Sequence, residues 1–217
     1  GIIEEEVISK DPLQFLADYQ ENIKVSFNEN LPTFTGGLVG YLGYDCIRYI
    51  EQKLSTFQLP DPLGTPDALF MVSEEVAVFD NLNNRLHLIV LSESESEFDI
   101  SRAKERLKVL SEKLLNPLSS ETSEKIGTPA KENDFLSGFG EKEFKKTVKK
   151  VQNYIKAGDV MQVVISQRMS VPFTSDPLEL YRSVRYLNPS PYLYYLNLEE
   201  FHIVGSSPEI LARLEEG

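Results

Sequence analysis

The order of helical and extended patterns after residue 135 constrains the fold of this chain more than any other feature. Residues Gly140–Ala157 carry apolar side chains at helical spacing, and Gly158 is placed to end the helix. An extended pattern over Asp159–Pro172 and a helical pattern over Pro177–Leu187 follow. A pair of strands and one further strand are predicted at Pro191–Leu198, Glu200–Gly205 and Glu209–Leu214. This order predicts an α+β fold with a mostly antiparallel sheet.

The first half of the chain shows a looser pattern of the same kind. Helices are predicted at Asp11–Asn22, Asp45–Leu54 and Asp99–Leu115, a glycine-rich strand at Thr35–Tyr44, and a hairpin formed by Leu69–Asp80 and Arg85–Leu91. Residues 117–134 are rich in Ser, Thr, Glu, Pro and Gly and hold few apolar side chains. Such a composition is typical of a linker or long loop.

Charge and composition exclude several classes of protein. The net charge of −12 argues against nucleic-acid binding, because phosphate contacts need clustered Lys and Arg. No apolar run approaches the ~20 residues that span a bilayer, and the start does not resemble a signal peptide. One cysteine, Cys46, suits a reducing compartment, so a cytoplasmic location is expected. The chain opens without methionine and closes just after an apolar segment, so we expect both ends to be cut rather than natural.

A glycine run at Gly36–Gly43 invites interpretation as a phosphate-binding loop. The run lacks the Gly-Lys-Ser/Thr that such a loop requires, and its spacing is not that of a dinucleotide fingerprint. Glycines within a strand more often mark the close approach of another backbone, and we predict that role here. The acidic runs of the chain are predicted to be solvated, and no metal ligand is assigned among them.

Three later segments are candidates for a binding site. Gly158–Arg168 predicts a strand with Gln162 on a polar face, which suits the wall of a polar cavity, although a half-exposed strand gives the same pattern. Asn188–Pro191 is a rigid corner followed by three tyrosines that offer ring faces to a planar ligand. Gly205–Glu209 is a tight connection that carries hydroxyls and one carboxylate.

Four segments together resemble the anthranilate synthase branch of the chorismate-binding enzyme family. They are Gly36–Asp45 (GGLVGYLGYD), Gly158–Arg168 (GDVMQVVISQR), Tyr181–Tyr192 (YRSVRYLNPSPY) and Gly205–Glu209 (GSSPE). In order and spacing they cover nearly the whole chain. The resemblance implies two large antiparallel sheets packed orthogonally, with helices outside. It also implies that residues 1–116 belong to the N-terminal lobe and that residues 135–217 begin the chorismate-binding catalytic lobe.

The resemblance implies a reaction and a role for one residue. Chorismate and ammonia would give anthranilate and pyruvate, with Mg²⁺ as cofactor and a glutamine amidotransferase subunit as the partner that supplies ammonia. Gln162 matches a position that holds lysine, the general base for water, in isochorismate- and salicylate-forming relatives. A glutamine amide cannot act as a base at neutral pH but can donate and accept hydrogen bonds. We therefore predict that Gln162 is a catalytic residue that orients ammonia or substrate.

A second site is implied at the proline-rich corner. The residues that look like part of a tryptophan feedback site are Asn188, Pro189, Ser190, Pro191, Tyr192 and Leu193. This site would lie about a domain's width from the chemistry. Inhibition from it would then work through different tryptophan affinities of two domain arrangements.

Parts of the family pattern are absent from the 217 residues. A Leu-Leu-Glu-Ser motif is expected before residue 1. The Pro-Ile-Ala-Gly-Thr loop, the catalytic histidine, the carboxylate-gripping arginine and the Mg²⁺-binding glutamates are expected after the Ser-Pro-Glu turn. The sequence is therefore expected to be an internal fragment that is inactive alone, since both preorganisation and metal would be missing.

Two alternatives stay open. Aminodeoxychorismate synthase component I shares glutamine at the position of Gln162, and the alanine or lysine that separates the two enzymes lies in the later Pro-Ile-x-Gly-Thr loop. A non-catalytic tryptophan-sensing module is the other alternative, and it would need a natural stop near Gly217.

Overall fold

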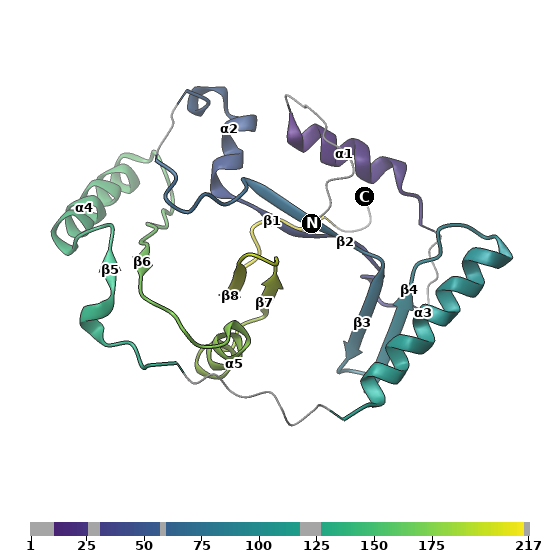
Figure 1. The fold of residues 1–217 in the computed structure, drawn as a ribbon. Helices are drawn as coiled ribbons and strands as arrows, with labels where there is room; N and C mark the ends of the chain where they lie inside the picture. The colour runs from purple at the N-terminus through teal and green to yellow at the C-terminus, as the bar shows by residue number, and fades with distance from the viewer. Residues whose placement is uncertain (1–10, 26–30, 57–59, 118–126, 215–217) are drawn as a thin grey trace. The chain divides into compact units, whose positions relative to one another are not determined.

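The computed structural model describes residues 11–25, 31–56, 60–117 and 127–214. The chain divides into two compact units, Gly1–Leu118 and Ser119–Gly217, which are described separately (Figure 1). Residues 118–126 of the predicted linker lie outside the described residues. The assignment of residues 1–116 and 135–217 to two lobes of the family stays a prediction.

The first unit opens with the predicted helix, α1 (Pro12–Asn22). The carboxylate of Asp11 accepts hydrogen bonds from the backbone amides of Leu13 and Gln14 at 3.0 and 3.1 Å. These bonds satisfy amides that have no partner inside the helix, and proline at the first helical position costs no hydrogen bond. The sequence prediction of this helix and its start is confirmed.

The glycine run forms the strand β1 (Gly37–Leu42), which pairs antiparallel with β2 (Ala68–Ser73). Gly40 lies opposite Phe70, and a Cβ atom on Gly40 would stand 1.9 Å from the carbonyl oxygen of Leu69. No side chain fits at that distance. The glycine therefore allows two backbones to approach closely, as predicted.

The predicted hairpin is correct at its turn and wrong along its first strand. The run Leu69–Asp80 is divided at Glu74 into β2 and β3 (Glu75–Asp80), and only β3 pairs with β4 (Arg85–Val90). The reason is a change of partner, because β2 bonds to β1, a strand that lies far away in sequence.

The turn between β3 and β4 is held by one carboxylate. Asp80 accepts from the amides of Leu82 and Asn83, both at 3.0 Å, and from the Asn83 side chain at 2.7 Å. Asn84 has a φ of 52°, a conformation that asparagine adopts more readily than most residues. Turn chemistry of this kind is local, so the sequence could predict it.

Helix α3 (Glu97–Leu115) lies beside the β3–β4 pair (Figure 1) and begins two residues earlier than predicted. The Ser96 hydroxyl accepts from the amide of Asp99 at 3.1 Å and caps the helix there. Arg106 donates to Glu75 at 2.7 Å and to Glu74 at 3.2 Å. These ion pairs connect the helix to the point where β2 passes into β3.

The helix predicted over Asp45–Leu54 is wrong as a single element. The structure has three short pieces, the 3₁₀ helices η1 (Tyr44–Cys46) and η2 (Gln52–Leu54) and, between them, α2 (Ile47–Ile50). Glu51 interrupts them with an extended backbone, and its carboxylate accepts from the amide of Lys53. This carboxylate caps the start of η2, and such a local bond competes with a continuous helix.

The second unit contains three elements predicted from sequence. They are the helices α4 (Glu141–Ala157) and α5 (Pro177–Leu187) and the hairpin of β7 (Tyr192–Asn197) with β8 (His202–Ser207). Gly158 ends α4 with a φ of 82° and donates to the carbonyls of the last turn. Asp176 caps α5 by accepting from the amide of Leu178 at 2.7 Å. These helices and the hairpin are confirmed.

Two predicted strands are wrong within the described residues. Of Asp159–Pro172, only β6 (Met169–Ser170) is a strand, and it pairs with β5 (Leu136–Ser137) after the 3₁₀ helix η3 (Glu132–Asp134). The described part of Glu209–Leu214 contains no strand. A strand needs a hydrogen-bonded neighbour, and in the described part of the chain residues 160–167 have none beside them.

The observed class is α+β, with antiparallel sheets that have two strands each among the described residues. The hydrophobic side chains buried there are Cys46, Ile89 and Leu198. Within the same residues, no helix combines the length and apolar character needed to cross a membrane.

Candidate functional site

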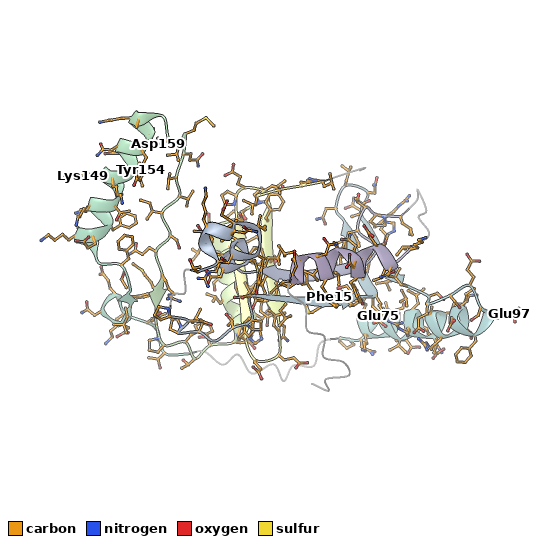
Figure 2. All side chains as sticks on the ribbon, turned by 90° about the horizontal axis from the view of Figure 1, so that it is seen from above. Phe15, Glu75, Glu97, Lys149, Tyr154 and Asp159 are labelled. Carbon is orange, nitrogen blue, oxygen red and sulfur yellow. The ribbon has the colours of Figure 1, made fainter. Side chains whose placement is uncertain are left out.

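Gln162 lies just after α4, in a segment that begins at the left-handed turn of Gly158. The C-terminal end of this helix, with Tyr154 and then Asp159, is visible in Figure 2. The Gln162 side chain is exposed, and its neighbours Met161 and Val164 are 97% and 84% exposed. Among the described residues no wall of a cavity forms around it, so its role stays a prediction.

The far end of this segment is held more firmly. Gln167 donates from Nε2 to the Ser137 hydroxyl at 3.0 Å and to the carbonyl of Phe139 at 3.3 Å. Gly138 donates its amide to the carbonyl of Arg168 at 3.3 Å, next to the short β5–β6 ladder. Gln167 was not singled out from the sequence, although a polar residue on the otherwise apolar side of the predicted strand is a signal that could have found it.

The proline-rich corner begins where α5 ends. Asn188 donates its amide to the carbonyl of Val184 at 2.8 Å and then leaves the helical conformation. The Ser206 hydroxyl donates to the carbonyl of Asn188 at 2.7 Å. Because Ser206 belongs to β8, the entrance to the corner is fixed on the hairpin, and Pro189 and Pro191 restrict the backbone that follows.

The hydroxyl of Ser190 is the unusual atom of this corner. It is buried from solvent and has no hydrogen-bond partner among the described residues. Buried polar atoms in folded proteins nearly always have a partner, so this oxygen is suited to a polar group supplied from elsewhere. The last two residues of the predicted site differ in exposure, since Tyr192 is exposed and Leu193 is half-buried in β7.

A groove of about 490 Å³ lies on the exposed face of β7. Its lining residues are Tyr192, Tyr194, Ser207, Glu209, Ile210, Ala212 and Arg213. The tyrosines and Glu209 belong to motifs noted in the sequence, whereas Ile210 and Arg213 fall in a segment that was predicted only as a strand. The structure therefore brings the tyrosine face and the chain after Gly205–Glu209 together.

The ring of Tyr194 lies across Gly205, its partner in β8, where a Cβ atom would stand 2.1 Å from the ring. On the opposite face Tyr195 contacts the rings of Tyr181 and His202, with centroids 6.1 and 5.6 Å apart. The hairpin thus presents one aromatic face to the groove and packs the other against α5.

The first unit contains a separate polar cluster around Asp67. Its carbonyl accepts from the amide of Gly43 at 2.7 Å and from Cys46 Sγ at 3.2 Å, while its carboxylate accepts from the Tyr49 hydroxyl at 3.2 Å. Burial, with the nearby Asp67 charge, raises the pKa of the Cys46 thiol. Burial and the hydrogen bond to Asp67 raise the pKa of the Tyr49 hydroxyl. A raised thiol pKa disfavours the nucleophilic thiolate, and the hydrogen bonds of this cluster join the chain after β1 to the residue before β2.

No group of three or more His, Cys, Asp or Glu side chains that could hold a metal ion occurs in the described part of the chain. Mg²⁺ is usually held by one or two carboxylates together with substrate oxygens and water. The described residues therefore give no basis for assigning magnesium ligands in this chain.

Comparisons with known proteins decide the family. Residues 3–217 match the family model described as chorismate binding enzyme. The chain belongs to this family. It is 44% identical to anthranilate synthase component 1 of Pseudomonas aeruginosa over 218 residues, covering 100% of this chain and 44% of that protein. The corresponding protein of Neisseria meningitidis serogroup B is 47% identical over 208 residues, covering 94% of this chain and 42% of that protein.

A solved structure of the family agrees with the fold. The crystal structure of anthranilate synthase component I from Streptococcus pneumoniae TIGR4 matches with a TM-score of 0.77 and 34% identity, over 98% of this chain and 47% of that one. The chain is thus a homologue of anthranilate synthase component 1 that spans under half the length of these relatives. The resemblance inferred from the four motifs is confirmed.

Proposed function

We propose that residues 1–217 form part of an anthranilate synthase component 1, which converts chorismate and ammonia to anthranilate and pyruvate in tryptophan biosynthesis. The observation that carries the proposal is the 44% identity to a protein of that name over the whole chain. The term full-length protein denotes a polypeptide of the relatives' length that contains residues 1–217.

In this proposal Gln162 orients ammonia or the chorismate ring through its amide. Ammonia is already a nucleophile, so the residue beside it must position it and need not remove a proton. A Gln162→Lys change in the full-length protein is expected to lower the rate of the ammonia reaction. Gln152→Lys, an exposed position on α4, is the matched control. An unchanged rate in the Gln162 variant would remove this role.

The corner from Asn188 to Leu193 is proposed to bind tryptophan as a feedback inhibitor. The tyrosine-lined groove, which includes Tyr192 of this corner, supports a ligand that has a ring, and the hydroxyl of Ser190 has no hydrogen-bond partner among the described residues. Pro189→Ala in the full-length protein is expected to raise the tryptophan concentration needed for inhibition and to leave the uninhibited rate unchanged. Pro172→Ala serves as the control, and unaltered inhibition in the Pro189 variant would exclude the corner.

The same proposal includes Mg²⁺ as the cofactor and a glutamine amidotransferase subunit as the partner that supplies ammonia. It also includes two orthogonally packed antiparallel sheets as the fold of the full-length protein. The expectation that residues 1–217 are inactive alone is also part of this proposal. Mg²⁺ would supply Lewis-acid assistance to loss of the chorismate hydroxyl in the full-length protein.

The test is the identity of the product. The full-length protein is incubated with chorismate, ammonia and Mg²⁺, and the products are separated and identified by mass spectrometry. Anthranilate and pyruvate are expected, and no product is expected from residues 1–217 alone. Aminodeoxychorismate would move the assignment to that synthase. No turnover in either protein, together with tryptophan binding by residues 1–217 in calorimetry, would favour a sensing module.

A further inference from the structure

We infer that Gln167 is a positioning residue for Gln162, an inference that rests on the proposed function. Gln167 fixes the end of the segment that carries Gln162 by donating to Ser137 Oγ at 3.0 Å and to the Phe139 carbonyl at 3.3 Å. Both acceptors lie about thirty residues earlier in the chain, so these bonds close a long loop at its base.

The acceptors of Gln167 are themselves fixed. The Ser137 hydroxyl donates to the Phe139 carbonyl at 2.9 Å and accepts from the Phe139 amide at 3.1 Å. The ring of Phe139 packs edge-on against that of Phe144, with centroids 5.5 Å apart. Since Phe144 belongs to the first turns of α4, Gln167 is anchored to a helix end rather than to a flexible loop.

Helix α4 also fixes the first end of the segment that carries Gln162. Helix α4 ends at Gly158, four residues before Gln162, and its start holds Phe139 through Phe144. The two ends of the segment are therefore fixed, the first by the helix C-terminus and the second by the side chain of Gln167, while the backbone between them has no strand partner among the described residues. A site placed on rigid elements holds its geometry better than one on a free loop.

The side chains of the two glutamines are held differently. Gln162 is exposed and lies in the part of the segment that forms no strand among the described residues. Gln167 bonds through its amide to Ser137 and Phe139, and these bonds fix the place where the segment ends. Gln162 therefore stays exposed, five positions along the chain from a fixed point.

The experiment is a double-mutant cycle in the full-length protein, with anthranilate formation from chorismate and ammonia as the assay. Gln167→Glu keeps the shape of the side chain and removes its donors. We expect kcat to fall about 10- to 100-fold, with the KM for chorismate within about 2-fold of wild type, because a displaced orienting group lowers the rate rather than binding. Gln152→Glu, an exposed glutamine of α4, is the matched control and should be unchanged.

The second arm separates positioning from a purely structural role. In a Gln162→Ala background, Gln167→Glu should cost less than about 2-fold, because its effect passes through a side chain that is gone. Full additivity, or a normal kcat for Gln167→Glu, would overturn the inference. If the Gln167 variant does not fold, Ser137→Ala removes one acceptor and is read in the same cycle. A wild-type protein that forms no anthranilate would overturn the proposed function and the inference with it.

Discussion

Strand pairs closed by short turns differ from pairs built between distant segments. The β3–β4 and β7–β8 pairs each match six residues with six across a short connection. The β5–β6 pair joins segments about thirty residues apart and matches two with two, and residues 160–167 beside it have no strand partner among the described residues. Short turns bring a partner at little entropic cost, whereas a distant partner must be supplied by packing.

The β1–β2 pair shows what that packing requires. Its strands are also distant in sequence, yet they match six residues with six. Hydrogen bonds from Tyr41, Cys46 and Tyr49 to the chain at Pro66 and Asp67 fix the approach to β2. Glycine in β1 then allows the backbones to meet. A pair of strands that are distant in sequence can therefore be long when side-chain hydrogen bonds next to the strands fix their register.

Gly40→Ala breaks the distant pair and gives the largest expected effect. The new methyl group would meet the backbone of β2 at 1.9 Å, and a backbone cannot rotate away as a side chain can. A loss of about 2–3 kcal/mol in the free energy of unfolding is expected, measured by urea denaturation of the 217-residue chain. Gly138→Ala is the control, because nothing lies within 4 Å of its Cβ, and a change under about 0.5 kcal/mol is expected. Equal losses would show that close approach at β1–β2 is not what limits that pair.

Asp176→Ala tests whether the β7–β8 hairpin, a pair closed by a short turn, depends on the helix that packs on it. Helix α5 packs on β7 and β8, and Asp176 caps its first turn. Loss of the cap is expected to lower the free energy of unfolding by about 1 kcal/mol, measured by circular dichroism during denaturation. Asp159→Ala, which removes an exposed carboxylate that makes no cap, should change it by under about 0.5 kcal/mol. If the free energy of unfolding does not fall in either variant, the hairpin is stable without the capped helix.

The smallest expected effect is a pH-dependent change in stability at the turn between β3 and β4. Hydrogen bonds from the Asn83 side chain and backbone hold the pKa of Asp80 below its usual range. A carboxyl with a lowered folded-state pKa stabilises the fold above its unfolded-state pKa, and this contribution disappears as pH falls through the folded-state value. Asn83→Ala should raise the pKa of Asp80, followed by NMR titration. Asn81→Ala, in the same turn, should leave it in place, and equal shifts would refute a specific Asn83 bond.

Sequence reasoning found what local chemistry determines. The helix starts near Asp11 and Pro177, Gly158 as a helix end and the turn after Asp80 depend on neighbours within a few residues. The change of partner at Glu74 and the state of Asp159–Pro172 depend on which distant segment pairs with them, and no local pattern carries that information. The motifs for the candidate site were readable from residue types, but the groove beside Tyr194 required the chain after Glu209 to be placed in space.

Hydrogen exchange of the amides from Gln162 to Gln167 tests most directly the claim that distant partners decide the order of this segment. In the 217-residue chain these amides are expected to exchange rapidly, while those of β7 and β8 are protected. In the full-length protein both sets are expected to be protected, because the larger sheets proposed for it would supply a partner strand. Protection of the segment in the 217-residue chain, or rapid exchange in both proteins, would contradict the account.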